Sequence, residues 1–252
     1  MKYSANINGI DTIAYYSEKT IRDLFAPLLK RLSAMHSEKQ NRIVVMLAAP
    51  PGAGKSTLVS FLEYLARETV PETSFQGIGM DGFHFQQEYL LSHAVSVNGS
   101  KIPMVDIKGA PVTFDLEKLT KKVAEVTAGH ICKWPYYDRN LHKPVEDAIT
   151  INSDVVLLEG NYLLLDMEGW RGLSEYADYT ISLFADEEIL RERLIKRKTA
   201  MGVNEAAAER FVDFSDMANV RLCLEKTKAA DLELEVAHDG TEIWVIEDFH
   251  SL

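Results

Sequence analysis

Residues 43–57, IVVMLAAPPGAGKST, decide how this chain folds. Six apolar residues predict a buried strand, a glycine-rich turn follows it, and residues 58–65 then place leucine and phenylalanine side chains on one face of a helix. Such a turn cradles phosphates, because its backbone N–H groups and the positive end of the helix face the anion. The residues expected to bind the phosphates of a nucleotide are Pro51, Gly52, Ala53, Gly54, Lys55, Ser56 and Thr57.

Two side chains of this motif carry chemistry, and one position departs from its usual form. Lys55 is expected to reach the outer phosphates, and the Ser56 hydroxyl is expected to ligate Mg²⁺. Ala49 stands where the motif ordinarily begins with glycine. Alanine fits there if the backbone needs only a negative φ, so the change bears on detailed geometry more than on the phosphate cradle. A chance match is the alternative, and the flanking strand and helix argue against it.

Composition and charge narrow the class of protein. The 252 residues are 46% hydrophobic and 26% charged, which is typical of a globular protein. The net charge of −11 argues against a broad nucleic-acid surface. No apolar run is long enough to span a membrane, and the N-terminus lacks a secretion pattern. Cys132 and Cys223 are far apart, so we expect two structural thiols in a reducing cytoplasm.

Strands alternate with helices along the chain, which predicts an α/β protein. We expect one domain over residues 1–252, with three layers, a mostly parallel central sheet and helices on both faces. The expected strands are residues 43–48, 75–80, 131–137, 154–158, 179–184 and 232–236, with a terminal hairpin through 241–246. The expected helices follow the phosphate loop and cover residues 115–129, about 186–202, and 204–230.

Three segments receive simpler predictions. Residues 1–42 should form a hairpin around Asn8-Gly9 and then a helix, an extension that packs on the core and need not touch the chemistry. Residues 86–114 read as irregular, because glycine and proline interrupt them. Pro144 is expected to close the loop that follows the strand at 131–137.

Two acidic residues stand where predicted strands end. Asp81 follows the strand at 75–80, and Glu159 follows the apolar residues 154–158. Ligands of parallel sheets bind beyond the carboxyl ends of the strands, so both carboxylates should lie near the phosphate loop. The simpler alternatives are a turn residue at Asp81, because Asp-Gly is a common turn pair, and a sheet-end carboxylate at Glu159.

The chain resembles the superfamily of uridine kinase, phosphoribulokinase and type I pantothenate kinase. The segments that carry the resemblance occur in the superfamily's order across about residues 43–245: 80–84 (MDGFH), 108–111 (KGAP), 114–115 (FD), 135–139 (PYYDR) and 158–160 (LEG). It is most similar to a nucleoside/nucleotide-kinase-like branch, some of whose members are called fructose-transport or sugar kinases. The resemblance implies a P-loop NTPase fold that uses ATP and Mg²⁺.

The resemblance also implies roles for individual residues. Lys55 would contact the β- and γ-phosphates, Asp81 would be the general base for the acceptor hydroxyl, and Glu159 would act on the metal or its waters beside Ser56. Residues that would meet the acceptor are His84, Lys108, Tyr137, Arg139 and Asn219. The alternatives are a structural histidine, a solvated loop lysine, and a tyrosine that serves only for packing.

Residues 186–202 resemble the lid helix of the superfamily. Arg193 and Arg197 are four apart and share one helix face, where their guanidinium groups would neutralise charge on the transferring phosphoryl group. A surface helix held by salt bridges to Glu187, Glu188 and Glu192 is the competing interpretation.

The sequence therefore predicts a cytoplasmic kinase that phosphorylates a hydroxyl of a small metabolite, with no nucleic-acid or membrane partner. A sugar- or pantothenate-like alcohol is the first expectation for the acceptor, and a nucleoside is the second. A nucleotide-driven regulatory ATPase is the alternative of another class, and a non-catalytic nucleotide-binding module is a further one, prompted by Ala49. A homodimer is suggested by family analogy alone.

Overall fold

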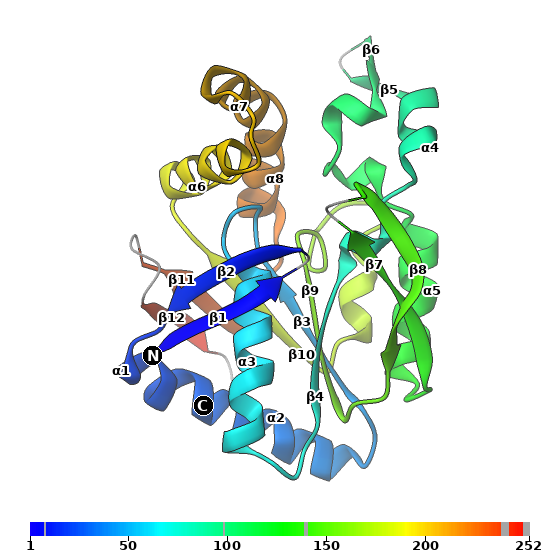
Figure 1. Cartoon of the computed structure of the whole chain (residues 1–252). Helices are drawn as coiled ribbons and strands as arrows, with labels where there is room; N and C mark the ends of the chain where they lie inside the picture. Colours follow the sequence, from blue (N-terminus) through cyan, green and yellow to red (C-terminus); the bar gives the residue numbers. More distant parts are fainter. Residues whose placement is uncertain (8, 98, 139–140, 238–241, 249–252) are drawn as a thin grey trace.

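The computed structural model describes residues 1–7, 9–97, 99–138, 141–237 and 242–248. Six strands form the central sheet, and all neighbours run parallel except the pair that includes β12. In sheet order they are β12 (Ile243–Asp248), β11 (Leu232–Val236), β10 (Tyr179–Phe184), β3 (Ile43–Ala48), β9 (Val155–Gly160) and β4 (Phe75–Gly79). The predicted α/β fold with a mostly parallel sheet is confirmed (Figure 1).

Helices cover both faces of this sheet, and their apolar spacing explains how they pack. Every residue of β3 and β9 is buried, as expected for parallel strands covered on two sides. On one face, α2 (Ala26–Lys39) and α3 (Lys55–Thr69) pack against alternate residues of β3 such as Val45. On the other face, α5 (Leu116–Thr127) packs against the intervening residues such as Val44.

The N-terminal extension is a hairpin followed by a helical segment. Strands β1 (Lys2–Ile7) and β2 (Ile10–Tyr15) pair antiparallel and lie across α3 (Figure 1). The Tyr3 hydroxyl bonds to Ser60 Oγ at 2.7 Å, and the Tyr16 ring stacks on Phe61 with centroids 4.4 Å apart. A short helix α1 (Glu18–Thr20) and a π turn at Ile21–Phe25 lead into α2.

Residues 86–114 contain regular structure, contrary to the prediction. Helix α4 (Gln87–Ser92) precedes a small antiparallel hairpin of β5 (Ala94–Val97) and β6 (Ser100–Pro103), and two 3₁₀ turns follow at Met104–Ile107 and Pro111–Thr113. Each element is short and half exposed, so it leaves little apolar periodicity to detect.

Two further boundaries differ from the prediction. Strand β7 (Cys132–Asp138) pairs antiparallel with β8 (Lys143–Ile151), so Pro144 lies within a strand opposite Tyr137 rather than closing a loop. The predicted helix at 204–230 is instead α7 (Glu205–Phe211), a π turn at Val212–Asp216, and α8 (Met217–Lys226). Asp186 caps helix α6 (Glu187–Ala200), and its carboxylate accepts the Glu188 N–H at 2.8 Å. Two more 3₁₀ turns lie at Met80–Phe83 and Leu173–Tyr176.

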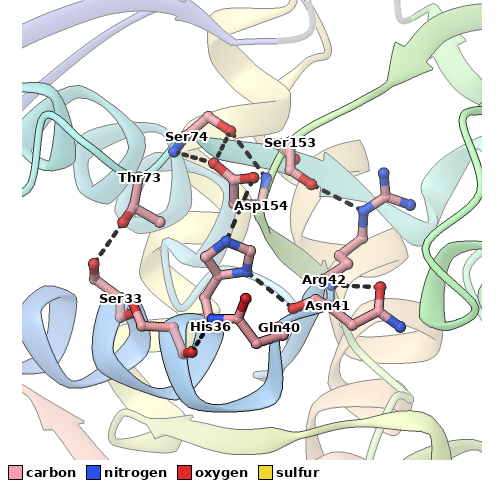
Figure 2. A network of polar contacts seen from close by, with 10 residues as sticks. Ser33, His36, Gln40, Asn41, Arg42, Thr73, Ser74, Ser153 and Asp154 are labelled. Carbon is pink, nitrogen blue, oxygen red and sulfur yellow. Dashed lines mark hydrogen bonds and ion pairs between the residues drawn. The ribbon is translucent and has the colours of Figure 1, made fainter.

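A polar network joins the amino ends of β3, β9 and β4 (Figure 2). Asp154 Oδ2 accepts the Ser74 hydroxyl at 2.7 Å and the Ser74 N–H at 2.8 Å. His36 on α2 lies 3.6 Å from Asp154 Oδ1, and its Nδ1 bonds to the Asn41 carbonyl at 2.9 Å. Arg42 Nε donates to the Ser153 carbonyl at 2.9 Å. This end of the strands is opposite the phosphate loop, so the network serves stability.

Removing the Asp154 carboxylate should destabilise this end of the sheet. Partial burial alone would raise the pKa of Asp154, but hydrogen bonds from Ser74 and the neighbouring His36 and Arg42 hold it below its usual value. A lowered folded-state pKa means that the carboxylate stabilises the fold above the unfolded-state pKa, about 3.9, and that this contribution is lost as pH falls through the folded-state pKa.

We expect Asp154→Ala to lower the free energy of unfolding at pH 7 by about 1–3 kcal/mol. Urea unfolding at pH 7 and at about pH 3 measures it, and the difference from wild type should shrink at the lower pH. The Asp106 side chain is exposed and makes no hydrogen bond with any described residue, so Asp106→Ala is the control. An equal loss in both variants would contradict the role of the network.

Candidate active site

The carboxyl ends of β3, β9 and β4 open onto a cavity of about 490 Å³. Helices α6, α7 and α8 lie on one side of these strand ends, and α4, β5 and β6 lie on the other side (Figure 1). The predicted site residues that line the cavity are Pro51, Gly52, Gly54, Lys55, Ser56, Thr57, Asp81, His84, Lys108, Tyr137, Arg193, Arg197 and Asn219. Glu159 lines an adjoining cavity of about 170 Å³, which Ser56, Asp81 and Tyr137 also border. Ala53 borders a third cavity of about 340 Å³, which Gly52, Gly54 and Thr57 also border. Arg139 lies outside the described residues.

The phosphate loop has the backbone that its glycines permit. Gly52 and Gly54 have φ of 86° and 93°, whereas Ala49 is buried and does not have a positive φ. Alanine at position 49 is therefore compatible with the loop. A Cβ added to Gly52 would lie 3.2 Å from the Leu190 carbonyl, so the loop packs closely on α6.

Ser56 and Glu159 are joined directly. The Ser56 hydroxyl donates to Glu159 Oε1 at 2.7 Å, and Glu159 is only 6% exposed. In the sheet, Glu159 stands opposite Leu47 of β3 and Gly79 of β4, so three strands meet at this carboxylate. A buried carboxylate beside a hydroxyl offers the oxygen ligands that Mg²⁺ prefers. The pair therefore fits a magnesium ion, which would neutralise phosphate charge when bound.

Asp81 lies in a 3₁₀ turn, Met80–Phe83, directly after β4. Its carbonyl accepts the backbone N–H of His84 at 3.2 Å and bonds to the imidazole Nδ1 at 2.9 Å. The turn is held against β7, because a Cβ on Gly82 would lie 2.5 Å from the Pro135 carbonyl oxygen. Asp81 is thus a turn residue that also borders two cavities, so the two interpretations of this residue are compatible.

The side of the cavity away from the phosphate loop is polar. Lys108 Nζ donates to the Tyr137 hydroxyl at 2.7 Å, to Gln87 Oε1 at 3.2 Å and to the His142 carbonyl at 3.4 Å. Burial lowers the pKa of Lys108, and the nearby Asp81 charge opposes that shift. The His84 ring lies against Phe114, with centroids 3.9 Å apart.

Helix α6 presents different faces to the core, the cavity and solvent. Leu190 and Leu194 are fully buried, and Arg193 and Arg197 line the cavity. Arg191 forms an ion pair with Asp213 on the exposed side, at 2.6 Å. Of the glutamates in the competing interpretation, Glu187 forms an ion pair with Arg221 of α8 at 2.6 Å. The role of Arg193 and Arg197 in neutralising phosphoryl charge stays a prediction.

Several cavity residues were not predicted. Asn161 follows Glu159-Gly160 at the end of β9, and its position after a strand could have identified it. Asp216 is 8% exposed and lies 3.2 Å from Lys198 Nζ, with both residues at the cavity. Lys198 belongs to α6 and Asp216 to the π turn before α8, and only the tertiary fold brings these two elements together.

The N-terminal hairpin reaches the site, contrary to the prediction that it need not. Ile7 and Thr12 line the main cavity, and Thr12 also borders the third cavity. The alternation along β1 and β2 turns Ile7, Thr12 and the anchoring Tyr3 toward α3, since every second residue of a strand shares a face. Because α3 begins at Lys55, a hairpin packed along it ends over the phosphate loop.

A sequence profile of the Phosphoribulokinase / Uridine kinase family matches residues 44–239. The chain belongs to this family. It is accordingly a P-loop small-molecule kinase by descent, and family membership implies ATP as the nucleotide. The matched segment begins in β3 and leaves out the N-terminal hairpin and α2.

Individual relatives agree with the family assignment. The chain is 41% identical over 241 residues to YggC of Escherichia coli K12, an uncharacterized protein, covering 95% of this chain and 98% of that one. It is 29% identical over 204 residues to a Schizosaccharomyces pombe protein named "Putative uridine kinase C227.14", covering 78% and 84% of the two chains. The crystal structure of a "putative fructose transport system kinase" from Silicibacter sp. TM1040 superposes with a TM-score of 0.73 at 29% identity, over 83% of this chain and 98% of that one.

Other kinds of site are not found in the described part of the chain. None of its helices is long and apolar enough to cross a membrane. No group of three or more His, Cys, Asp and Glu side chains among those residues could hold a metal ion by itself. Cys223 is fully buried, and burial raises the pKa of its thiol to about 12, which is unsuited to a nucleophile.

The close approach at Gly82 provides a test of how Asp81 is positioned. We expect Gly82→Ala to destabilise the fold by about 1–3 kcal/mol, because the new methyl group would meet the β7 backbone. Gly172→Ala is the matched control, since an added Cβ there meets nothing within 4 Å; its effect should stay within about 0.5 kcal/mol. Thermal unfolding measures both, and a neutral Gly82→Ala would show that the turn is not held against β7.

Proposed function

We propose that this protein transfers the γ-phosphoryl group of ATP to a hydroxyl group of a small metabolite. The observation that carries the proposal is the convergence of Lys55, Ser56, Asp81 and Glu159, from three adjacent strand ends, on two adjoining cavities. Phosphoryl transfer needs such a set: an anion cradle, oxygen ligands for a metal ion, and a carboxylate that orients the attacking hydroxyl.

In the proposed reaction, each residue acts where the fold places it. The loop backbone and Lys55 hold the triphosphate, and Ser56 with Glu159 would hold Mg²⁺. Asp81 orients the acceptor hydroxyl and takes its proton as the acceptor oxygen bonds to the γ-phosphorus. The bond from that phosphorus to the β–γ bridging oxygen breaks, and ADP leaves with the electron pair. Arg193 and Arg197 offset the charge of the transferring group.

The acceptor end of the cavity supports a small polar alcohol. Hydrogen-bonding side chains line it, namely those of His84, Lys108, Tyr137, Asn161 and Asn219. A sugar- or pantothenate-like acceptor is our first choice, and the resemblance to sugar kinases and to a "putative fructose transport system kinase" supports it. A nucleoside is the second candidate, supported by the relative named "Putative uridine kinase C227.14".

Asp81→Asn tests the proposed base. We expect acceptor-dependent ADP formation to fall by roughly 100-fold or more, because asparagine cannot take the proton. The affinity for Mg²⁺ and a non-hydrolysable ATP analogue should stay near that of wild type, and Asp106→Asn should behave as wild type in both assays. Undiminished turnover would remove Asp81 from this role. Steady ATP hydrolysis by wild type that no small alcohol alters would favour a regulatory ATPase.

Glu159→Gln tests the proposed metal ligand. Replacing the carboxylate with an amide should raise the Mg²⁺ concentration needed for half-maximal nucleotide binding by roughly 10- to 100-fold. Glu63→Gln is the matched control and should leave the Mg²⁺ dependence unchanged. Glu63 borders the same smaller cavity, but its carboxylate accepts the Gly77 N–H at 2.9 Å rather than the Ser56 hydroxyl. Fluorescent-nucleotide titration against Mg²⁺ measures the effect. An unchanged magnesium dependence in Glu159→Gln would exclude the metal role.

A further inference from the structure

The charges around the main cavity are unevenly distributed. Two carboxylates line it among the described residues, those of Asp81 and Asp216. The cationic side chains that line it are Lys55, Lys108, Arg193, Arg197 and Lys198. This excess of positive charge occurs in a chain whose net charge is −11, so it belongs to the site and not to the general composition.

Most of these cations have an evident use. Lys55 lies in the phosphate loop, and Arg193 and Arg197 come from the helix that packs on that loop. Lys198 lies 3.2 Å from the Asp216 carboxylate, which neutralises it. Lys108 differs because it comes from the opposite side of the cavity, next to Tyr137 of β7.

The contacts of Lys108 fix its position without neutralising its charge. Its three hydrogen-bond partners are a phenol, an amide and a backbone carbonyl, and its Nζ also lies 5.0 Å from the centre of the Tyr137 ring. No carboxylate of the described residues forms an ion pair with it. The charge of Asp81 is near enough to favour the charged form of Lys108.

A half-buried ammonium group that no carboxylate contacts directly costs free energy, and a bound anion relieves that cost. Three separate segments supply the hydrogen-bond partners of Lys108: Gln87 comes from α4, Tyr137 from β7, and His142 directly precedes β8. A lysine whose ammonium group was simply hydrated at the surface would not need hydrogen-bond partners from three segments to hold it in place. The polar lining around it belongs to the acceptor end of the cavity rather than to the phosphate loop.

We infer that the phosphoryl acceptor carries an anionic group, a carboxylate or a phosphate, which pairs with Lys108 while its hydroxyl group meets Asp81. The inference rests on the proposed function, because it takes this end of the cavity as the acceptor site. It narrows the acceptor from small alcohols in general to hydroxy acids or sugar phosphates.

Matched pairs of compounds test the inference. Gluconate with sorbitol, pantothenate with its alcohol pantothenol, and fructose 6-phosphate with fructose differ within each pair in the anionic group. Each is titrated by calorimetry into protein saturated with Mg²⁺ and a non-hydrolysable ATP analogue, so that the phosphate loop is already filled. We expect at least one anionic member to bind about tenfold or more tightly than its neutral twin. The carboxylate and phosphate arms identify which anion is preferred.

Variants locate the preference at Lys108. In Lys108→Gln the advantage of the anionic member should disappear, while affinity for the nucleotide analogue stays unchanged; Lys108→Arg should retain part of it. Lys101→Gln, an exposed lysine on β6, is the matched control. Melting temperatures of the unliganded variants check that each variant folds. If Lys108→Gln does not fold, Lys108→Arg provides the comparison with wild type.

Two outcomes would overturn the inference: no anionic compound binds more tightly than its neutral twin, or the preference survives in Lys108→Gln. Failure of the proposed function has a different signature. Anion binding that depends on Lys108, without ADP formation when ATP replaces the analogue, would contradict the kinase reaction and support the anion site.

Discussion

The parallel register of β3, β9 and β4 is the constraint on which the site depends. Leu47, Glu159 and Gly79 stand side by side, so the three strands deliver the phosphate loop, the buried carboxylate and the Asp81 turn to one edge. A shift of one residue in β9 would turn Glu159 to the other face of the sheet. The Glu159 carboxylate would then lose the hydrogen bond that the Ser56 hydroxyl now donates to it. Sheet pairing and polar satisfaction therefore specify the same arrangement.

Close backbone approaches fix the loops to this frame. Gly52 allows the phosphate loop to touch α6, and Gly82 allows the Asp81 turn to touch β7. The two contacts lie on opposite sides of the cavity. Residues that act on the phosphates and residues that face the acceptor are consequently held by different parts of the fold, and the central sheet sets the spacing between them.

The sequence was sufficient to predict the central sheet, the loop and the strand-end carboxylates, because the strands that carry them are apolar runs with local signals at their ends. It was not sufficient for β8, whose residues are mostly exposed and which is ordered by pairing with β7. The π turn at Val212–Asp216 interrupts a continuous helical pattern, and Asp216 meets Lys198 only in the folded chain. The contribution of the hairpin was missed for the same reason, since nothing local indicates that Ile7 lies over the loop.

The hairpin and the phosphate cradle share one helix. Ser56 and Ser60 are one turn apart on α3; the first bonds to Glu159 and the second to the Tyr3 hydroxyl. The hairpin also lies outside the segment that matches the family profile. The hairpin is thus coupled mechanically through α3 to the phosphate cradle, so a shift of residues outside the family segment would be transmitted to Ser56.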